Sequence, residues 1–259
     1  MAEFKADQIS TNGDFNYFRK IWHLLGLILP VFVYADPLRN QGGLADLTRL
    51  FATVFLIISL LLIVLVDYFR LKSEKFQGFF YKYFGFLMKE EEKLRMNATI
   101  PYFFANLVLF LFFSREVAVI SCIFLMFGDP FAAFVGLKYG KIRIKNGKSL
   151  EGLIAFFIFA LLFSIMFILI HSIHSSAYDS FSLFRETLIN YDVLIILTFG
   201  SIIAAFTEFY SKNMLYGLVD DNLLIPLTSA VSISLIAYTI FDFPVYTLFY
   251  NPFDLFIRI

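Results

Sequence analysis

Seven long apolar runs, separated by polar segments, dominate the pattern of this 259-residue chain. About 20 apolar residues cross the roughly 30 Å hydrocarbon core of a bilayer, so each run predicts one membrane-spanning helix, the shorter ones with help from flanking residues. The runs are 21–34, 50–68, 98–113, 117–137, 153–170, 193–210 and 223–241. The pattern therefore predicts an all-α, polytopic membrane protein with about seven transmembrane helices.

Two of these predicted spans contain helix-disrupting residues. Pro30 removes a backbone donor and crowds the carbonyl of Gly26, four residues earlier. In the fourth run, Asp129 followed by Pro130 predicts an interruption, with Asp129 as the N-cap of a new half-helix. A carboxylate at membrane depth costs about 2.5–3.5 kcal/mol unless it meets a partner or a wet cavity, which favours a functional role for Asp129.

The polar segment 69–97 carries a second kind of pattern. Its apolar residues repeat at helical spacing opposite Lys75, Gln77 and Lys82, and they are Phe76, Phe79, Phe80, Tyr83, Phe84 and Leu87. This pattern predicts one amphipathic helix that lies in the membrane interface.

Charge distribution sets the expected orientation. Placing the N-terminus inside assigns 16 of the 21 Lys and Arg residues to the cytoplasmic side and five to the other side. We expect one integral membrane domain over 1–259, with a polar segment at 1–18 and cytoplasmic loops at 69–97 and 138–152. The formal net charge of zero gives no overall basic field, and we expect no nucleic-acid partner.

The predicted cytoplasmic ends gather the polar residues that could carry chemistry. Arg19, Lys20 and His23 share one helix end, where they could hold phosphate, although two cations there are also typical of a topological anchor. Lys148 precedes Ser149, a good N-cap, and Gly152 lets a ligand approach the backbone, so this helix start predicts a phosphate cradle.

Two further patterns leave alternatives open. Small residues recur every fourth position on one face, as close helix packing requires, at Gly128, Ala132, Gly136 and Gly140. Oxygen ligands that suit magnesium occur at Glu208, Asp221 and Asn222. Glu208 could instead pair with Lys212, and either Asp220 or Asp221 could merely cap the last span.

Four motifs in this order resemble the CTP-dependent polyprenol and lipid kinases, namely dolichol kinase, phytol kinase and the yeast-type diacylglycerol kinase. They are Arg19-Lys20-x-x-His23-x-x-Gly26, Gly128-Asp129-x-x-Ala132-x-x-x-Gly136-x-x-x-Gly140, Lys148-Ser149-x-Glu151-Gly152, and Glu208 followed by Asp221-Asn222-x-x-x-Pro226. The resemblance implies CTP as donor, Mg²⁺, a membrane lipid alcohol as acceptor and transfer of the γ-phosphoryl group.

The resemblance also implies roles for individual residues. Catalytic roles fall to Asp129, Asp221 and His23, and metal ligation to Asp129, Glu208, Asp221 and Asn222. Nucleotide binding falls to Arg19, Lys20, Gly136, Gly140, Lys148, Ser149, Glu151 and Gly152.

Other classes of function remain open at this point. The middle motif is also distantly similar to CDP-diacylglycerol synthase, a cytidylyltransferase that directs attack to the α-phosphorus, and broken helices occur in small transporters. We expect a multi-pass protein of the bacterial inner membrane, or of the endoplasmic reticulum in a eukaryote, embedded in the lipid bilayer with its active site on the cytoplasmic side. The sequence also permits a homodimer.

Overall fold

The computed structural model describes residues 21, 24–39, 41–88, 92, 94–144, 147–174, 179–185 and 188–258. The α-helices in this part of the chain are α2 (Ile28–Ala35), α3 (Leu47–Lys72), α4 (Glu74–Phe84), α5 (Thr99–Phe112), α6 (Arg115–Ile123), α7 (Asp129–Tyr139), α8 (Leu150–His174), α9 (Tyr191–Tyr210), α10 (Asp221–Phe241) and α11 (Val245–Leu248). Strands β1 (Phe184–Arg185) and β2 (Leu188–Ile189) form one antiparallel pair. The structure is therefore predominantly helical, as the sequence predicts.

Five helical stretches in the described residues are long and apolar enough to cross a membrane. They are α3, the continuous stretch Arg115–Tyr139, α8, α9 and α10. Two of the seven predicted spans correspond to shorter helices, because α5 has 14 residues and α2 has eight. The structure thus supports a multi-pass membrane protein, and the count of seven spans stays a prediction.

The prediction of an interrupted helix at Asp129 is wrong. Residues Phe124–Gly128 form a π-helical turn that joins α6 to α7 without a break, and Asp129 has helical backbone angles. A π-turn widens the helix, which accommodates the missing N–H of Pro130 and the crowding between its ring and the preceding turn. Asp129 is therefore an interior residue of a continuous helix rather than an N-cap.

The weakened turn predicted near Pro30 is present. The helix α2 starts only at Ile28, and the carbonyl oxygen of Gly26 accepts a 2.7 Å hydrogen bond from the Tyr102 hydroxyl of α5. The Tyr102 hydroxyl thus donates to the Gly26 carbonyl in place of the backbone N–H that would donate to it in a regular helix.

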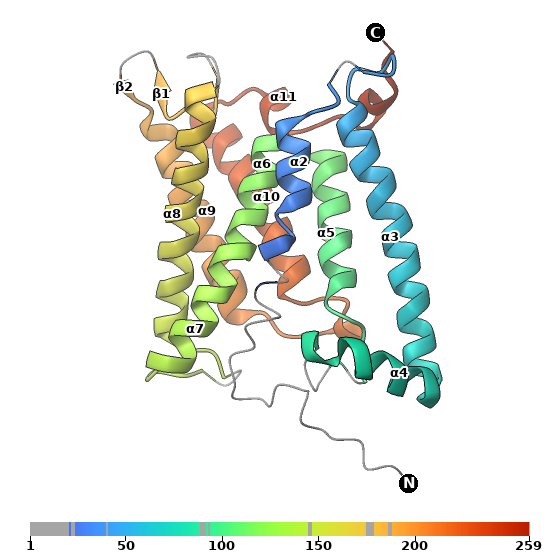
Figure 1. Cartoon of the computed structure of the whole chain (residues 1–259). Helices are drawn as coiled ribbons and strands as arrows, with labels where there is room; N and C mark the ends of the chain where they lie inside the picture. Colours follow the sequence, from blue (N-terminus) through green and yellow to red (C-terminus); the bar gives the residue numbers. More distant parts are fainter. Residues whose placement is uncertain are drawn as a thin grey trace.

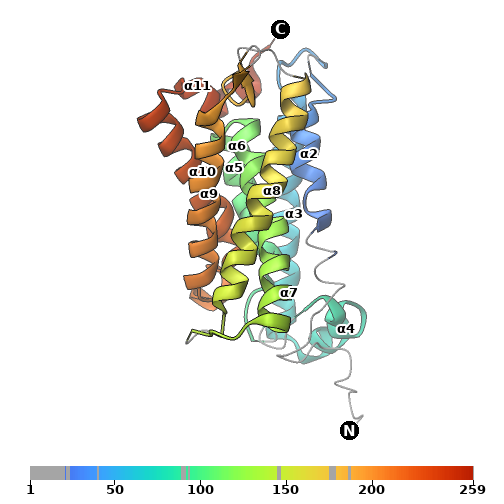
Figure 2. The same cartoon turned by 90° about the vertical axis from the view of Figure 1, so that its left-hand side faces the viewer.

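The helices form one bundle in which α10 packs against α9, α5 and α6, while α8 packs against α7 and α9 (Figures 1 and 2). The helix α6 is the centre of the bundle, because every residue from Val117 to Ile123 is buried. By contrast α3 stands at the edge and exposes most of its apolar side chains, as expected of a helix that faces lipid.

The two ends of the bundle differ in structure. The helix α4 and the C-terminal end of α7 lie at one end, whereas β1, β2 and α11 lie at the other (Figure 1). The α4 helix occupies most of the predicted amphipathic segment and exposes Phe79, Tyr83 and Phe84. Its location in a membrane interface stays a prediction.

Candidate active site

A tight hairpin precedes α8 and determines where Lys148 lies. The backbone N–H of Ile144 donates to the carbonyl of Lys148, and that of Leu150 donates to the carbonyl of Ile142, each at 2.9 Å. Gly147 has φ +83°, a conformation that favours glycine. These contacts deliver Lys148 immediately before α8.

Other residues of the Lys-Ser-x-Glu-Gly motif make contacts that build this hairpin. The Ser149 hydroxyl accepts a 3.1 Å hydrogen bond from the Gly152 N–H, which confirms its predicted role as an N-cap. The Glu151 carboxylate accepts from the backbone N–H groups of Lys141 and Ile142. Nucleotide binding by Ser149, Glu151 and Gly152 stays a prediction.

The glycine face of α7 packs closely against α8. A Cβ atom on Gly128 would lie 2.5 Å from the Phe156 ring, and one on Gly140 would lie 2.7 Å from the Ser149 Cβ. A Cβ atom on Gly136 would meet the Ser149 hydroxyl at 3.0 Å. The packing role predicted for the small residues is confirmed, and nucleotide contacts of Gly136 and Gly140 stay a prediction.

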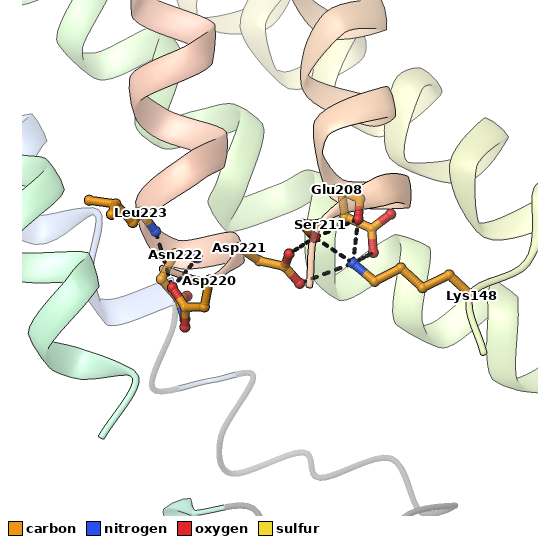
Figure 3. A network of polar contacts seen from close by, with 7 residues as sticks. All are labelled: Lys148, Glu208, Ser211, Asp220, Asp221, Asn222 and Leu223. Carbon is orange, nitrogen blue, oxygen red and sulfur yellow. Dashed lines mark hydrogen bonds and ion pairs between the residues drawn. The ribbon is translucent and has the colours of Figure 1, made fainter. Parts of the chain in front are cut away.

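The Lys148 ammonium lies between two acidic side chains from different helices (Figure 3). Its Nζ atom is 2.9 Å from Oε1 of Glu208 on α9 and 3.1 Å from Oδ2 of Asp221 at the start of α10. It also donates a 3.0 Å hydrogen bond to the hydroxyl of Ser211, which in turn donates to the Asp221 carboxylate. The alternative pairing of Glu208 with Lys212 is wrong, since the ion pair of Glu208 is with Lys148.

Asp129 of α7 completes this cluster. Carboxylate oxygens of Asp129, Glu208 and Asp221 all lie within 4.8 Å of one another. Helices α7, α9 and α10 thus bring together three of the four residues that the sequence predicts as metal ligands. We call Asp129, Lys148, Glu208 and Asp221 the carboxylate–lysine cluster.

Adjacent residues at the start of α10 have different roles. Asp220 is the N-cap, because its Oδ1 accepts hydrogen bonds from the N–H groups of Asn222 at 2.9 Å and Leu223 at 3.2 Å. The Asn222 amide donates a 2.8 Å hydrogen bond to the other oxygen of Asp220. This division of roles leaves the Asp221 side chain directed to the cluster (Figure 3).

Charge and burial shift the ionisation of two groups at this site. Burial raises the pKa of Asp220 to about 7, with a contribution from the negative charge of Asp221. Burial would lower the pKa of Lys148, but the carboxylates of Asp221 and Glu208 outweigh it and raise that pKa. Lys148 is therefore a permanent cation at neutral pH.

The donor set of the cluster fits a divalent cation. Carboxylates that bind a cation are ionised, so in the cation-bound form these three groups and the Lys148 ammonium would together carry a net charge of −2, which suits a divalent cation. Carboxylate oxygens are the ligands that Mg²⁺ prefers, and Asp129, Glu208 and Asp221 are the residues that would hold it.

One hollow is lined in part by the carboxylate–lysine cluster, and a second hollow lies beside the first. A small polar cleft is lined by Asp129, Asp220 and Asp221 together with Glu92, Arg95, Met96, Ala98, Asn213, Gly217 and Asn222. A predominantly apolar cavity of about 460 Å³ lies beside it, and its walls include Leu25, Leu62, Phe80, Phe84, Tyr102 and Met126. Glu92, Ala98 and Asn222 line both hollows, so the apolar cavity and the cleft adjoin at these residues.

Some predicted residues lie outside the described part of the chain. They are Arg19, Lys20 and His23, whose roles stay predictions. Conversely, the sequence reasoning missed Ser211, which hydrogen bonds to both Lys148 and Asp221. The available signal was a hydroxyl three residues after Glu208, just past the end of α9.

The chain is similar in sequence to several known proteins. An uncharacterized protein from Rickettsia prowazekii is 28% identical over 228 residues, which cover 87% of this chain and 96% of that protein. A CTP-dependent diacylglycerol kinase from Schizosaccharomyces pombe is 30% identical over 172 residues, covering 66% of this chain and 74% of the relative. The corresponding Saccharomyces cerevisiae enzyme is 28% identical over 141 residues, which span 54% of this chain and about half (46%) of the relative.

No protein-family profile matches the chain, and no solved structure matches it. The match to the S. pombe enzyme nevertheless covers most of that relative. By this relationship, the chain belongs to the family that contains the CTP-dependent diacylglycerol kinases.

Proposed function

We propose that the chain is a membrane-embedded kinase that transfers the γ-phosphoryl group of CTP to the hydroxyl group of a lipid alcohol. The observation that carries this proposal is the convergence of Asp129, Glu208 and Asp221 around Lys148, beside a polar cleft that adjoins an apolar cavity. Family membership supports the use of CTP and a lipid, since the yeast relatives are named for both.

Phosphoryl transfer mainly requires positioning and neutralisation of charge. Lys148 supplies a fixed positive charge that could contact a phosphate, and Ser211 helps to orient it. Asp129, Glu208 and Asp221 would hold Mg²⁺, which when bound neutralises the charge of the triphosphate. A phosphate group of the nucleotide that reaches the polar cleft would lie next to Asp129 and Asp221, which line it.

The apolar cavity suits the hydrocarbon part of the acceptor. Its volume of about 460 Å³ lies within the range of about 300–1,000 Å³ that is typical of small-ligand sites. Its walls are mostly aliphatic and aromatic, and its junction with the cleft is polar. A lipid alcohol could therefore bury its chain there and present its hydroxyl group to the carboxylate–lysine cluster. The charge asymmetry of the sequence supports a cytoplasmic location for this end of the bundle.

Label transfer distinguishes this activity from its alternatives. Purified protein in lipid vesicles is incubated with Mg²⁺, CTP labelled at either the α- or the γ-phosphorus, and a panel of diacylglycerol, polyprenol and phytol-like alcohols. We expect the γ-label in the lipid product. An α-label in lipid would instead indicate a cytidylyltransferase, and no label with any acceptor would contradict the proposed kinase activity.

A further inference from the structure

Glu92 occupies the junction between the two hollows. Of the three residues that line both the apolar cavity and the polar cleft, Ala98 and Asn222 cannot ionise, whereas Glu92 carries a carboxyl group. Glu92 is only 4% exposed. An acidic group so deeply buried is costly, and its location where an acceptor chain would meet the phosphate side is a reason to look for a chemical role.

The backbone of Glu92 is fixed by a buried arginine. Arg70 of α3 is fully buried, and its Nη1 donates a 2.7 Å hydrogen bond to the carbonyl of Glu92. Its Nη2 donates a 2.6 Å hydrogen bond to the carbonyl of Arg95. Two hydrogen bonds from one guanidinium group therefore hold both ends of the segment that carries Glu92.

Further hydrogen bonds orient the arginine itself. Arg70 Nε donates to Oδ1 of Asp67 at 2.6 Å, and Arg70 Nη1 donates to the Tyr81 hydroxyl at 2.9 Å. The other oxygen of Asp67 accepts a 3.0 Å hydrogen bond from the N–H of Asn97. Because a buried arginine is tolerated only when its donors are paired, this network gives a rigid support for Glu92.

We propose that Glu92 receives the proton of the acceptor hydroxyl group during phosphoryl transfer, an assignment that rests on the proposed kinase activity. The hydroxyl oxygen forms a bond to the γ-phosphorus while the bond from that phosphorus to the β–γ bridging oxygen breaks. The electron pair of the broken bond leaves with CDP, and the hydroxyl proton passes to the Glu92 carboxylate. The ligand class at the junction is thus an alcohol at the end of an apolar chain.

The test compares variants of the full-length protein in lipid vesicles with Mg²⁺, γ-labelled CTP and the best acceptor of the panel. A positioned general base contributes typically about 10²–10⁴-fold, so we expect Glu92→Gln to lower kcat by about a hundredfold or more. The KM for CTP should change by no more than about twofold, because the phosphate-binding groups are intact. The acidic limb of the pH–rate profile should also disappear. Glu74→Gln, which changes an exposed glutamate on α4, is the matched control and should keep wild-type rates.

A second variant separates chemistry from folding. Glu92→Asp keeps a carboxylate but withdraws it by one methylene, so we expect an intermediate loss of about tenfold with the acidic limb retained. If wild type is active and Glu92→Gln has the same kcat and the same pH profile as wild type, the proposed role of Glu92 is overturned. Equal losses of kcat in Glu92→Gln and Glu92→Asp, with the shape of the pH–rate profile unchanged, would also overturn it. Wild-type protein that labels no acceptor would overturn the proposed kinase activity instead.

Discussion

The Nζ atom of Lys148 lies 2.9 Å from Oε1 of Glu208, although the two residues are 60 positions apart in the chain. This ion pair joins the hairpin before α8 to the end of α9. It also holds a permanent cation beside Asp221, which lines the polar cleft.

Removal of the Lys148 charge should weaken nucleotide binding. A hydrogen bond to a charged group contributes about 1.5–3 kcal/mol, so we expect Lys148→Ala to raise the KM for CTP by about tenfold or more. The acceptor KM should change little. Lys212→Ala removes an exposed cation four residues after Glu208 in the sequence and serves as the control. If both variants bind CTP equally well, Lys148 does not contact the nucleotide.

The close approach of α7 and α8 should make Gly128 sensitive to a single methyl group. A Cβ atom there would lie 2.5 Å from the buried Phe156 ring, so Gly128→Ala should lower the melting temperature in detergent despite the better helix propensity of alanine. At Gly78 of α4, a Cβ atom would meet no atom within 4 Å, and Gly78→Ala should be neutral or stabilising. Equal melting temperatures for the two variants would contradict the packing role.

Filling the apolar cavity should weaken acceptor binding selectively. Ile63 of α3 lines the cavity, whereas Ile58 on the same helix is 53% exposed and does not. We expect Ile63→Trp to raise the acceptor KM by about tenfold, the loss that about 1.4 kcal/mol of binding free energy represents, without a change in the KM for CTP. Ile58→Trp should leave both constants unchanged. If Ile63→Trp has the same KM for the acceptor as wild type, the acceptor lipid does not bind in the apolar cavity.

The raised pKa of Asp220 predicts a pH-dependent stability. Because burial raises this pKa to about 7, the folded protein favours the protonated carboxyl group. Its contribution to the free energy of unfolding is complete below about pH 4 and is lost as the pH rises through about 7. In the presence of a chelator, the melting temperature of wild type should therefore fall more steeply between these pH values than that of Asp220→Asn. If the melting temperatures of wild type and Asp220→Asn change with pH in parallel, the pKa of Asp220 is not raised.

Hydropathy and charge could predict much of the fold, because long apolar helices follow from local composition. The continuity of α6 and α7 could not be predicted, since a π-turn around Asp129 and Pro130 depends on tertiary packing rather than on local propensity. Arg49 and Arg115 are two of the five Lys and Arg residues that the charge count assigns to the non-cytoplasmic side. The structure pairs Arg49 with Asp46, and Arg115 with both Asp36 and Asp46.

The residue types of the candidate site could be predicted, but several of their contacts could not. Helical spacing offered Lys212 as the partner of Glu208, whereas the structure selects Lys148 through the packing of α8 against α9. Sequence alone also left Asp220 and Asp221 equivalent as helix caps. Only the geometry of the first turn of α10 assigns the cap to Asp220 and directs Asp221 to the cluster.

These two adjacent aspartates provide the most direct test of the central claim. Asparagine caps a helix about as well as aspartate, so Asp220→Asn should keep near-wild-type activity. Asp221→Asn and Asp129→Asn remove carboxylates of the cluster and should each lower the rate by about a hundredfold or more while the size-exclusion profile stays unchanged.

The decisive measurement is the initial rate of γ-label transfer from CTP to the lipid acceptor as a function of Mg²⁺ concentration, for wild type and the three Asn variants. We predict fast transfer by wild type and Asp220→Asn, and a large loss in Asp129→Asn and Asp221→Asn with a shifted Mg²⁺ dependence. Near-wild-type rates and unchanged Mg²⁺ dependence in both cluster variants would contradict the proposed role of the carboxylate–lysine cluster.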